Sequence, residues 1–319
     1  MQKNKDIADF EEKINIYIDQ ESYKKLISDG QSFNILDKHK KVNVNRMINL
    51  IISNYLSEYT ESLNKSISNT FEILKSEGIE DNTATNLARK IIWKNDSSNY
   101  EYGSRSKDKT LPARINNSNH VIIEENYYDL QQSISKSNYI RNLLYSYLSL
   151  SPFEREKILY KNEIDRIQIA ISNELMIRYE NKENGNKVEL SPYKLCPSTQ
   201  ENRNYLVGRT KNHILTIRLS NLSHVILLKE KAYFGDDFET YFELMKKNGV
   251  QFYIDKVNIT KIRMSENAIR VFNRKEFDRP VPKEIEPYPD GTAVYTFDCS
   301  EFQLKAYFEP FADSIEYLW

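Results

Sequence analysis

Cysteine is scarce in this sequence. Only Cys196 and Cys299 occur among 319 residues, and they lie far apart along the chain. This scarcity argues against the disulfide framework of small secreted domains and favours a reducing compartment. The first residues, MQKNKDIADFEEK, lack the apolar stretch of a signal peptide, and no run approaches the roughly 18 apolar residues of a membrane span. We therefore expect a cytoplasmic protein that is neither secreted nor inserted in a membrane.

The signatures of common enzyme classes are also missing. The sequence has no G-x-S-x-G elbow, no Walker loop, no dinucleotide glycine fingerprint and no H-E-x-x-H pair. His213 and His224 could meet on neighbouring strands, but no cysteine or carboxylate lies at a metal-ligand spacing from them. Acidic pairs such as Glu124–Glu125 and Asp236–Asp237 are explained by strand ends and helix caps. We predict no catalytic residue, no metal and no cofactor.

No excess of charge of one sign is present. Lys plus Arg number 45 and Asp plus Glu number 46, for a net charge of −1. A surface that binds a polyanion must therefore be local. The length and the 39% hydrophobic content allow a sizeable core and favour two or three domains. The 22 tyrosines and 14 phenylalanines can stack on bases, although most are expected in the core.

The N-terminal region begins with a strand pattern. Residues Lys13–Asp19 alternate, with isoleucines on one face and Lys13, Asn15 and Tyr17 on the other. A short helix over Glu21–Ser28 is predicted next, and then a longer helix capped by Asn43 or Asn45. Strand, helix, helix is the order of a ribbon-helix-helix motif.

The same order is predicted a second time. His120–Glu124 is taken as a strand, Asn126–Ile134 as a helix and Lys136–Leu150 as the second helix, with the polar stretch Asn95–Asn119 as a loop before them. Asn45, Asn49 and Leu50 correspond to Asn138, Asn142 and Leu143 at a constant offset, which indicates an internal repeat. One copy cannot bury its strand and helix face alone, so we expect the two copies to pair within the chain.

Short strands dominate the next region. A connecting helix is predicted over Ser151–Ala170, and five strands with an Asn184–Gly185 turn follow and suggest a small barrel. The strands are predicted at Leu175–Tyr179, Lys187–Leu195, Asn204–Thr210, Ile214–Leu219 and His224–Glu230.

The C-terminal region mixes helices and strands. Asp236 caps a predicted helix that runs to about Asn248 and stops at Gly249. The order after it is strand, helix, two strands, helix, strand, over Asp255–Met264, Glu266–Arg274, Glu284–Tyr288, Thr292–Asp298, Glu301–Phe311 and Ser314–Leu318. The predicted fold class is therefore α+β and multidomain.

Four regions are predicted along the chain. They are a ribbon-helix-helix-like region at 1–150, a connecting helix at 151–172, a barrel with its trailing helix at 173–249 and an α+β extension at 250–319. The last of these is a candidate dimerisation domain.

Two sets of residues are candidates for binding nucleic acid, because arginine contacts phosphate in a bidentate manner and tyrosine stacks on an unpaired base. The first set recurs along the barrel strands: Arg178, Tyr179, Lys187, Lys194, Tyr205, Arg209, Lys211 and Arg218. The second is the outer face of the ribbon with the start of the helix behind it: Lys13, Asn15, Tyr17, Asn45 and Arg46. From spacing alone, both sets can also be ordinary surface cations and core tyrosines.

Several motifs in the barrel region resemble a WYL domain. They are Pro192–Leu195, Asn204–Val207, Leu215–Leu222 and Tyr233–Phe234. The chain departs from the family pattern, since Asn204 replaces the tryptophan of the triplet and Leu215 and Asn221 replace two arginines of the later strand. The resemblance implies a small SH3/Sm-like barrel that binds nucleic acid or nucleotide-like effectors. Its functional residues carry over to Tyr205 and Arg218.

The resemblance extends to the C-terminus and also implies a function. The combination of ribbon-helix-helix copies with a WYL domain is similar to accessory proteins of type VI-D CRISPR systems, which bind RNA and stimulate an RNA-guided RNase. We accordingly expect a non-catalytic, homodimeric protein that binds single-stranded RNA and has a CRISPR RNase as its functional partner. The alternative is a DNA-binding transcriptional regulator in which the ribbon reads an operator and the barrel senses a ligand.

Overall fold

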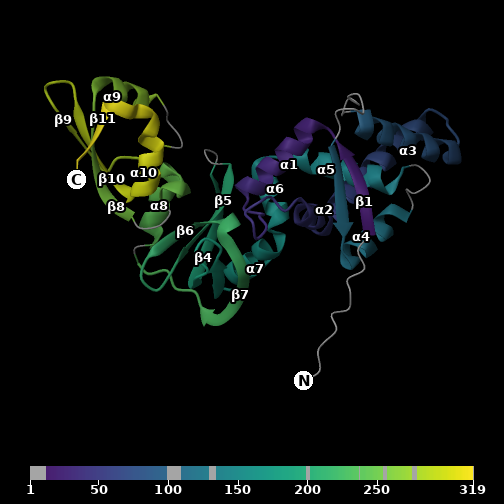
Figure 1. The fold of residues 1–319 in the computed structure, drawn as a ribbon, viewed down its shortest axis with the longest axis horizontal. Coiled ribbons are helices and arrows are strands. Elements are labelled where there is room, and N and C mark those ends of the chain that lie inside the picture. Colours follow the sequence, from purple (N-terminus) through teal and green to yellow (C-terminus); the bar gives the residue numbers. More distant parts are fainter. Residues whose placement is uncertain are drawn as a thin grey trace. The chain divides into compact units, whose positions relative to one another are not determined.

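The protein is an α+β chain of more than one compact unit. Its structure, a computed structural model, describes residues 12–98, 109–128, 134–198, 202–236, 238–253, 257–274 and 279–318. The chain divides into two units, Met1–Leu159 and Tyr160–Trp319, and the strands form three antiparallel sheets (Figure 1). Within the described ranges, no helix is both long and apolar enough to span a membrane.

The N-terminal unit is built around one two-stranded ribbon. Strand β1 pairs with β2 in antiparallel register, and alternate residues of both strands, among them Ile16 and Ala113, are fully buried. The elements of this unit are β1 (Glu12–Ile18), α1 (Gln20–Ser32), α2 (Val44–Ser76), α3 (Asp81–Ser98), β2 (Lys109–Ile115), α4 (Asn117–Tyr127), α5 (Lys136–Ser149) and α6 (Pro152–Leu159). The order strand, helix, helix therefore occurs twice, and the two strands pair within the chain.

The second copy differs from its predicted boundaries. The predicted strand His120–Glu124 is wrong, because these residues lie in α4, where Asn116 caps the helix by accepting a hydrogen bond from the Asn119 amide at 2.8 Å. The strand is instead β2, within the stretch that was expected to be a loop. The helix predicted over Asn126–Ile134 covers only the end of α4 and residues outside the described ranges.

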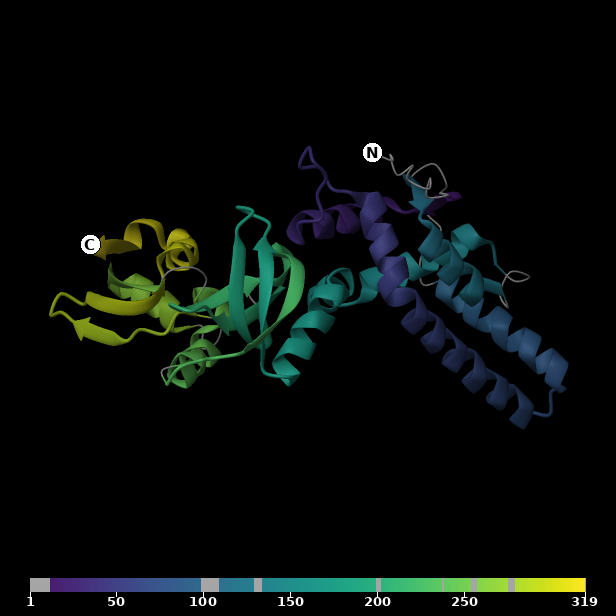
Figure 2. The same cartoon turned by 90° about the horizontal axis from the view of Figure 1, so that it is seen from below.

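The second helix of each copy begins where a cap residue was expected. Asn43, and not Asn45, caps α2, since its side chain accepts a hydrogen bond from the Arg46 amide at 3.0 Å. Ser135 caps α5 in the same way through the amide of Asn138. Helix α2 continues far beyond the length of α5 and packs along α3, which gives this copy a long helical hairpin (Figure 2).

The C-terminal unit begins with a five-stranded sheet in the order β6-β5-β4-β3-β7. All five predicted strands are present, but the single helix predicted over Ser151–Ala170 is two helices, α6 and α7. The elements are α7 (Lys161–Ser172), β3 (Leu175–Asn181), β4 (Lys187–Ser198), β5 (Arg203–Arg209), β6 (Ile214–Arg218), η3 (Leu219–Asn221) and β7 (Leu222–Lys231). A bulge in β4 between Pro192 and Lys194 interrupts its pairing with β5 and bends the strand there.

The rest of this unit follows the predicted order. Helix α8 ends before Gly249, whose φ of 91° suits the left-handed position that glycine takes after a helix. A four-stranded sheet in the order β11-β8-β10-β9 then forms. These elements are α8 (Phe238–Asn248), η4 (Val250–Tyr253), β8 (Val257–Met264), α9 (Glu266–Asn273), β9 (Glu284–Pro287), β10 (Ala293–Ser300), α10 (Glu301–Phe308), η5 (Glu309–Ser314) and β11 (Ile315–Leu318).

One hydrophobic cluster joins the two sheets of the C-terminal unit. It includes Tyr205 and Val207 of β5, Phe272 of α9 and Phe297 of β10. Because both sheets contribute to the same buried cluster, the side chains at the start of α10 are positioned against the strands of the first sheet. That packing sets up the pocket described next.

Candidate nucleic-acid interface

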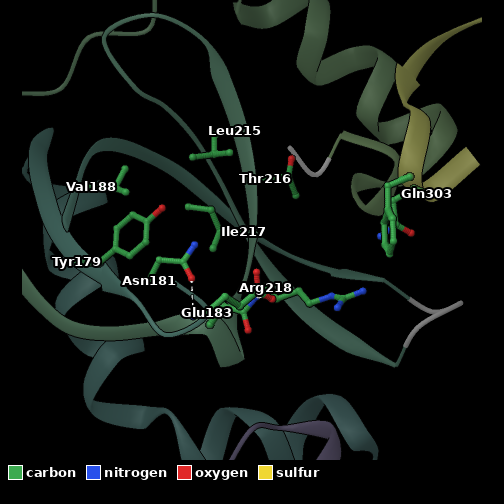
Figure 3. A pocket seen from close by; sticks show the side chains of 11 residues that line it. Tyr179, Asn181, Glu183, Val188, Leu215, Thr216, Ile217, Arg218 and Gln303 are labelled. Carbon is green, nitrogen blue, oxygen red and sulfur yellow. Dashed lines mark hydrogen bonds between the residues drawn. The ribbon is translucent and has the colours of Figure 1, made fainter. Parts of the chain in front are cut away.

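The C-terminal unit carries a pocket of about 310 Å³ between its five-stranded sheet and α10 (Figure 3). Strand β6 supplies a continuous stretch, Leu215–Arg218, and α10 supplies Phe302 and Gln303. The other lining residues are Tyr179, Asn181, Glu183, Val188 and Asn221. The volume lies at the lower end of the range for small-molecule sites, and a lining that is partly apolar and partly amide suits an organic ligand.

Arg218 is the cation of this pocket. It is the last residue of β6, opposite Tyr205 of β5 in the strand register, and its Nε donates a hydrogen bond to the Tyr205 hydroxyl at 3.4 Å. Tyr205 is fully buried in the hydrophobic cluster, so it orients Arg218 from behind and does not itself face a ligand. The two residues that the WYL resemblance singled out thus contact one another.

Tyr179 lines the same pocket from β3. Only 2% of the residue is exposed, and burial raises the pKa of its hydroxyl well above the ordinary value for tyrosine. The hydroxyl therefore stays protonated and can both donate and accept a hydrogen bond at any physiological pH. Figure 3 shows it directed toward the side of the pocket where Leu215 and Ile217 lie.

Three polar residues form a small network at the pocket's edge. The Asn221 amide donates to a Glu183 carboxylate oxygen at 2.8 Å, and the Glu183 backbone amide donates to the Asn181 side-chain oxygen at 2.9 Å. With no other partner among the described residues, the Asn181 amide nitrogen and the Asn221 side-chain oxygen can bond to a ligand. Asn221, one of the departures from the WYL pattern, thus contributes a neutral amide in place of an arginine.

The other cations predicted to bind nucleic acid on the five-stranded sheet lie outside this pocket. Arg178 and Lys187 adjoin Tyr179 and Val188 on their strands and so project to the opposite face of the sheet. Arg178 pairs there with Glu189, with Nη2 2.5 Å from the carboxylate, which neutralises its charge.

Three more of them are placed elsewhere on the same sheet. Lys194 Nζ lies 5.9 Å from the centre of the Phe242 ring, Arg209 ends β5, and Lys211 is exposed in the turn to β6. Of the eight predicted barrel residues, the structure brings together Tyr179 and Arg218, with Tyr205 behind them.

Sequence reasoning missed the contribution of α10. Leu304, Tyr307 and Phe308 are buried at helical spacing, which leaves the large aromatic Phe302 off the buried face. An aromatic residue at such a position was a readable signal for contact with a ligand or a partner. That it faces strand β6 was not readable, because this depends on how the two sheets pack.

The ribbon face is arranged as the alternation predicted. Lys13, Asn15 and Tyr17 are exposed on β1, and the paired strand presents Thr110, Pro112 and Arg114 on the same face. Lys13 is opposite Arg114 in the register, so two cations are neighbours on this surface. The second strand of the ribbon is therefore β2 and not the predicted His120–Glu124, which belongs to α4.

Asn45 and Arg46 have different positions at the start of α2. The Asn45 side-chain oxygen accepts a hydrogen bond from the Arg114 amide at 2.7 Å, so Asn45 ties the helix to β2. Arg46 is exposed in the first turn. Of these two residues, Arg46 is the more exposed, and Asn45 is partly buried.

Glu12, His120 and Glu124 form the one group among the described residues whose ligand atoms lie close enough together to hold a metal ion, within 4.8 Å of one another. The Lys136 ammonium already contacts both carboxylates, at 3.1 Å from Glu12 and in direct contact with Glu124. A lysine in this position supplies the positive charge that a metal would bring. The cluster is therefore an ion-pair network that links β1, α4 and α5.

The fold is shared with a protein of known structure. No protein-family model matches the sequence, and no curated protein matches it. The structure of a CRISPR Cas-related protein is similar to it with a TM-score of 0.67 and 19% identity, over 100% of this chain and 92% of that chain. Proteasome accessory factor B/C (PafBC) of Arthrobacter aurescens aligns over 97% of this chain and 62% of that chain, at 8% identity. Its TM-score of 0.32 is too low to indicate a common fold. The first likeness shows a common fold.

Proposed function

We propose that this chain is a non-catalytic accessory protein that binds single-stranded RNA and stimulates an RNA-guided CRISPR RNase in the cytoplasm. The observation that carries the proposal is the pocket between β6 and α10, where Arg218, an exposed aromatic ring and neutral amides come together. Single strands are bound in proteins by cations that follow the backbone and by aromatic rings that stack on bases. A duplex hides its bases and cannot use such a pocket.

The CRISPR part of the proposal is supported by the shared fold. The similar solved structure is that of a CRISPR Cas-related protein, and its likeness covers the whole of this chain. The proposal includes the WYL assignment of the five-stranded sheet, the ribbon-helix-helix assignment of the N-terminal unit, the domain limits given above and a homodimer formed through the C-terminal extension. In this proposal Arg218 neutralises phosphate in the pocket and Tyr205 holds Arg218 in place. Arg178 and Arg209 lie outside the pocket and would contact the strand only beyond it.

Fluorescence anisotropy with labelled single-stranded RNA, single-stranded DNA and duplex DNA tests the proposal. We expect single strands to bind more tightly than the duplex, and Arg218→Ala to weaken single-strand binding about tenfold through the loss of one charged contact. The slope of log affinity against log salt should fall by about 0.7, the value for one phosphate contact on a single strand.

The matched control is Arg270→Ala. Arg270 is exposed on α9, where its guanidinium bonds only locally to Asn267 at 2.9 Å. This variant has the same change in net charge and should bind RNA as the wild type does. Equal losses in both variants would assign the effect of Arg218→Ala to net charge and would count against the pocket.

A second candidate function is transcriptional regulation through the ribbon. The observation that favours it is the solvent-exposed face on which Lys13 and Arg114 are paired beside Tyr17. Two-stranded ribbons of this width can enter the major groove of DNA. In that case the pocket of the C-terminal unit would sense a ligand.

A further inference from the structure

Two polar side-chain groups face the pocket and are candidates for contact with a ligand. The Tyr179 hydroxyl and the Gln303 carboxamide belong to residues that are 2% and 6% exposed, and both residues line the cavity. Within the described ranges, neither side-chain group makes a hydrogen bond to another residue. The polar atoms of both groups are open to the pocket and not sealed in the core, so they can donate to and accept from a ligand there.

An exposed aromatic side chain lies on the same wall as Gln303. Phe302 is 67% exposed, whereas Leu304, Tyr307 and Phe308 of the same helix are buried in the hydrophobic cluster. Nothing in the packing of α10 requires a large apolar ring at this position. A ring that faces a polar cavity offers a flat surface for stacking, which every nucleobase can use.

The charged residues of the pocket indicate where a phosphate can bind and where a base can bind. Arg218 is the one cation among the residues that line the pocket, and Glu183 adds a carboxylate there. A phosphate beside Glu183 would be repelled, whereas the N–H groups of a base can donate to it. The neutral donors and acceptors of Asn181, Asn221 and Gln303 match the edge of a base in the same way.

We propose that this pocket holds one unstacked nucleobase, with Phe302 stacked on its face and Gln303 and Tyr179 hydrogen-bonded to its edge. The sugar–phosphate then lies at Arg218. This inference rests on the proposed function and deepens it, because it adds a specificity site formed jointly by the barrel strands and α10. The base can belong to a single strand or to a free nucleotide, and the experiment distinguishes these two sources.

The experiment uses the full chain and single-stranded RNAs that carry 2-aminopurine at successive positions. Stacking on an aromatic ring quenches the fluorescence of 2-aminopurine. We expect at least one position to be quenched on binding, and Phe302→Ala to abolish this quenching and to weaken affinity about tenfold. Phe302→Tyr should restore both, because it keeps the ring.

The control is Tyr128→Ala, which removes an aromatic residue that is 70% exposed in the other unit. This variant should leave the quenching unchanged. Gln303→Leu adds a second test of the same pocket: it should change which base is bound most tightly while the salt dependence at Arg218 stays the same.

Nucleoside monophosphates used as competitors identify the source of the base. Competition that depends on Phe302 means that the site takes free nucleotides, and the absence of competition with quenching retained means that it requires a strand. The inference is overturned if the wild type binds RNA and Phe302→Ala shows unchanged quenching and affinity. If the wild type binds no RNA but binds monophosphates through Phe302, the pocket assignment holds and the proposed function fails.

Discussion

At the scale of single residues, the N-terminal unit contains a buried ion pair between Arg155 and Asp29. Arg155 of α6 contacts Asp29 of α1 with both Nε and Nη2, at 2.7 and 2.9 Å, and each residue is about 95% buried or more. The Tyr147 hydroxyl donates to the same carboxylate at 3.2 Å, and Arg155 Nη1 donates to the Leu150 carbonyl at 2.5 Å. Asp29 and Arg155 therefore satisfy one another inside the unit, and removing either side chain would leave the charge of the other buried without its partner.

Asp29→Ala should lower the free energy of unfolding of the N-terminal unit by about 3–5 kcal/mol, because Arg155 would remain buried without its carboxylate. Urea denaturation followed by circular dichroism measures the change. The comparison is Asp81→Ala, which breaks the exposed pair of Lys75 and Asp81 and should cost at most about 1 kcal/mol. If both variants lowered the free energy of unfolding equally and by less than about 1 kcal/mol, the buried pair of Asp29 and Arg155 would not stabilise the unit as expected.

At the scale of elements, Asn49 joins three parts of the N-terminal unit. Its side-chain amide donates to the carbonyls of Asn45 and Arg114 at 2.9 and 2.8 Å. Its side-chain oxygen accepts from the Asn116 amide at 3.2 Å and from Asn119 Nδ2 at 2.9 Å. Helix α2 is thereby fixed to the end of β2 and the start of α4.

Asn49→Ala should destabilise the folded protein by about 2–3 kcal/mol, since it leaves several partly buried groups without partners. Hydrogen exchange should become faster in β2 and α4 and stay unchanged in the five-stranded sheet, because the latter belongs to the other unit. Asn49→Asp keeps the acceptor but places a carboxylate oxygen against the carbonyls of Asn45 and Arg114, so it should destabilise the protein at least as much as Asn49→Ala. A uniform increase in exchange over the whole chain would show that Asn49 has no local role.

The elements also show what the sequence could and could not predict. Strand β1 and the five strands of the β6-β5-β4-β3-β7 sheet were predicted because each has a clear alternation or lies between turn residues. Strand β2 was missed because Pro112 interrupts its pattern and polar residues surround it. A two-stranded ribbon leaves one edge of each strand unpaired, and a proline is tolerated there.

At α4, a helix was predicted to be a strand, again because the local pattern is ambiguous. The run His120–Glu124 is short and apolar, and periodicity alone cannot separate a strand from a helix at that length. The decisive signal was the cap at Asn116, which lies before the run. For the pocket, Arg218 and Tyr179 could be named from the sequence. Phe302 could be recognised only as an aromatic residue off the buried face of α10, and its place opposite β6 could not be predicted, because no local pattern reports how α10 packs against β6.

At the scale of the whole molecule, each unit has its own candidate surface for nucleic acid. The ribbon face belongs to the N-terminal unit and the pocket to the C-terminal unit. The ribbon presents cations and a tyrosine on a flat strand face, which suits a duplex groove, whereas the pocket can admit only a base that has left its stack. The two proposed functions therefore predict opposite responses to the same pair of variants.

Replacing Lys13, Asn15 and Tyr17 together by alanine should leave the affinity for single-stranded RNA within about twofold of the wild type, because sites without shared partners act independently. Anisotropy with RNA and with duplex DNA measures both affinities, and Asn64→Ala with Lys65→Ala, two exposed changes on α2, serves as the control. If the wild type binds duplex tightly and the triple variant loses it while Arg218→Ala does not, the chain acts through the ribbon as a regulator. If RNA binding depends on Arg218 and Phe302 and is indifferent to the ribbon, the accessory function stands, because a phosphate contact and a stacked base account for the binding without a second surface.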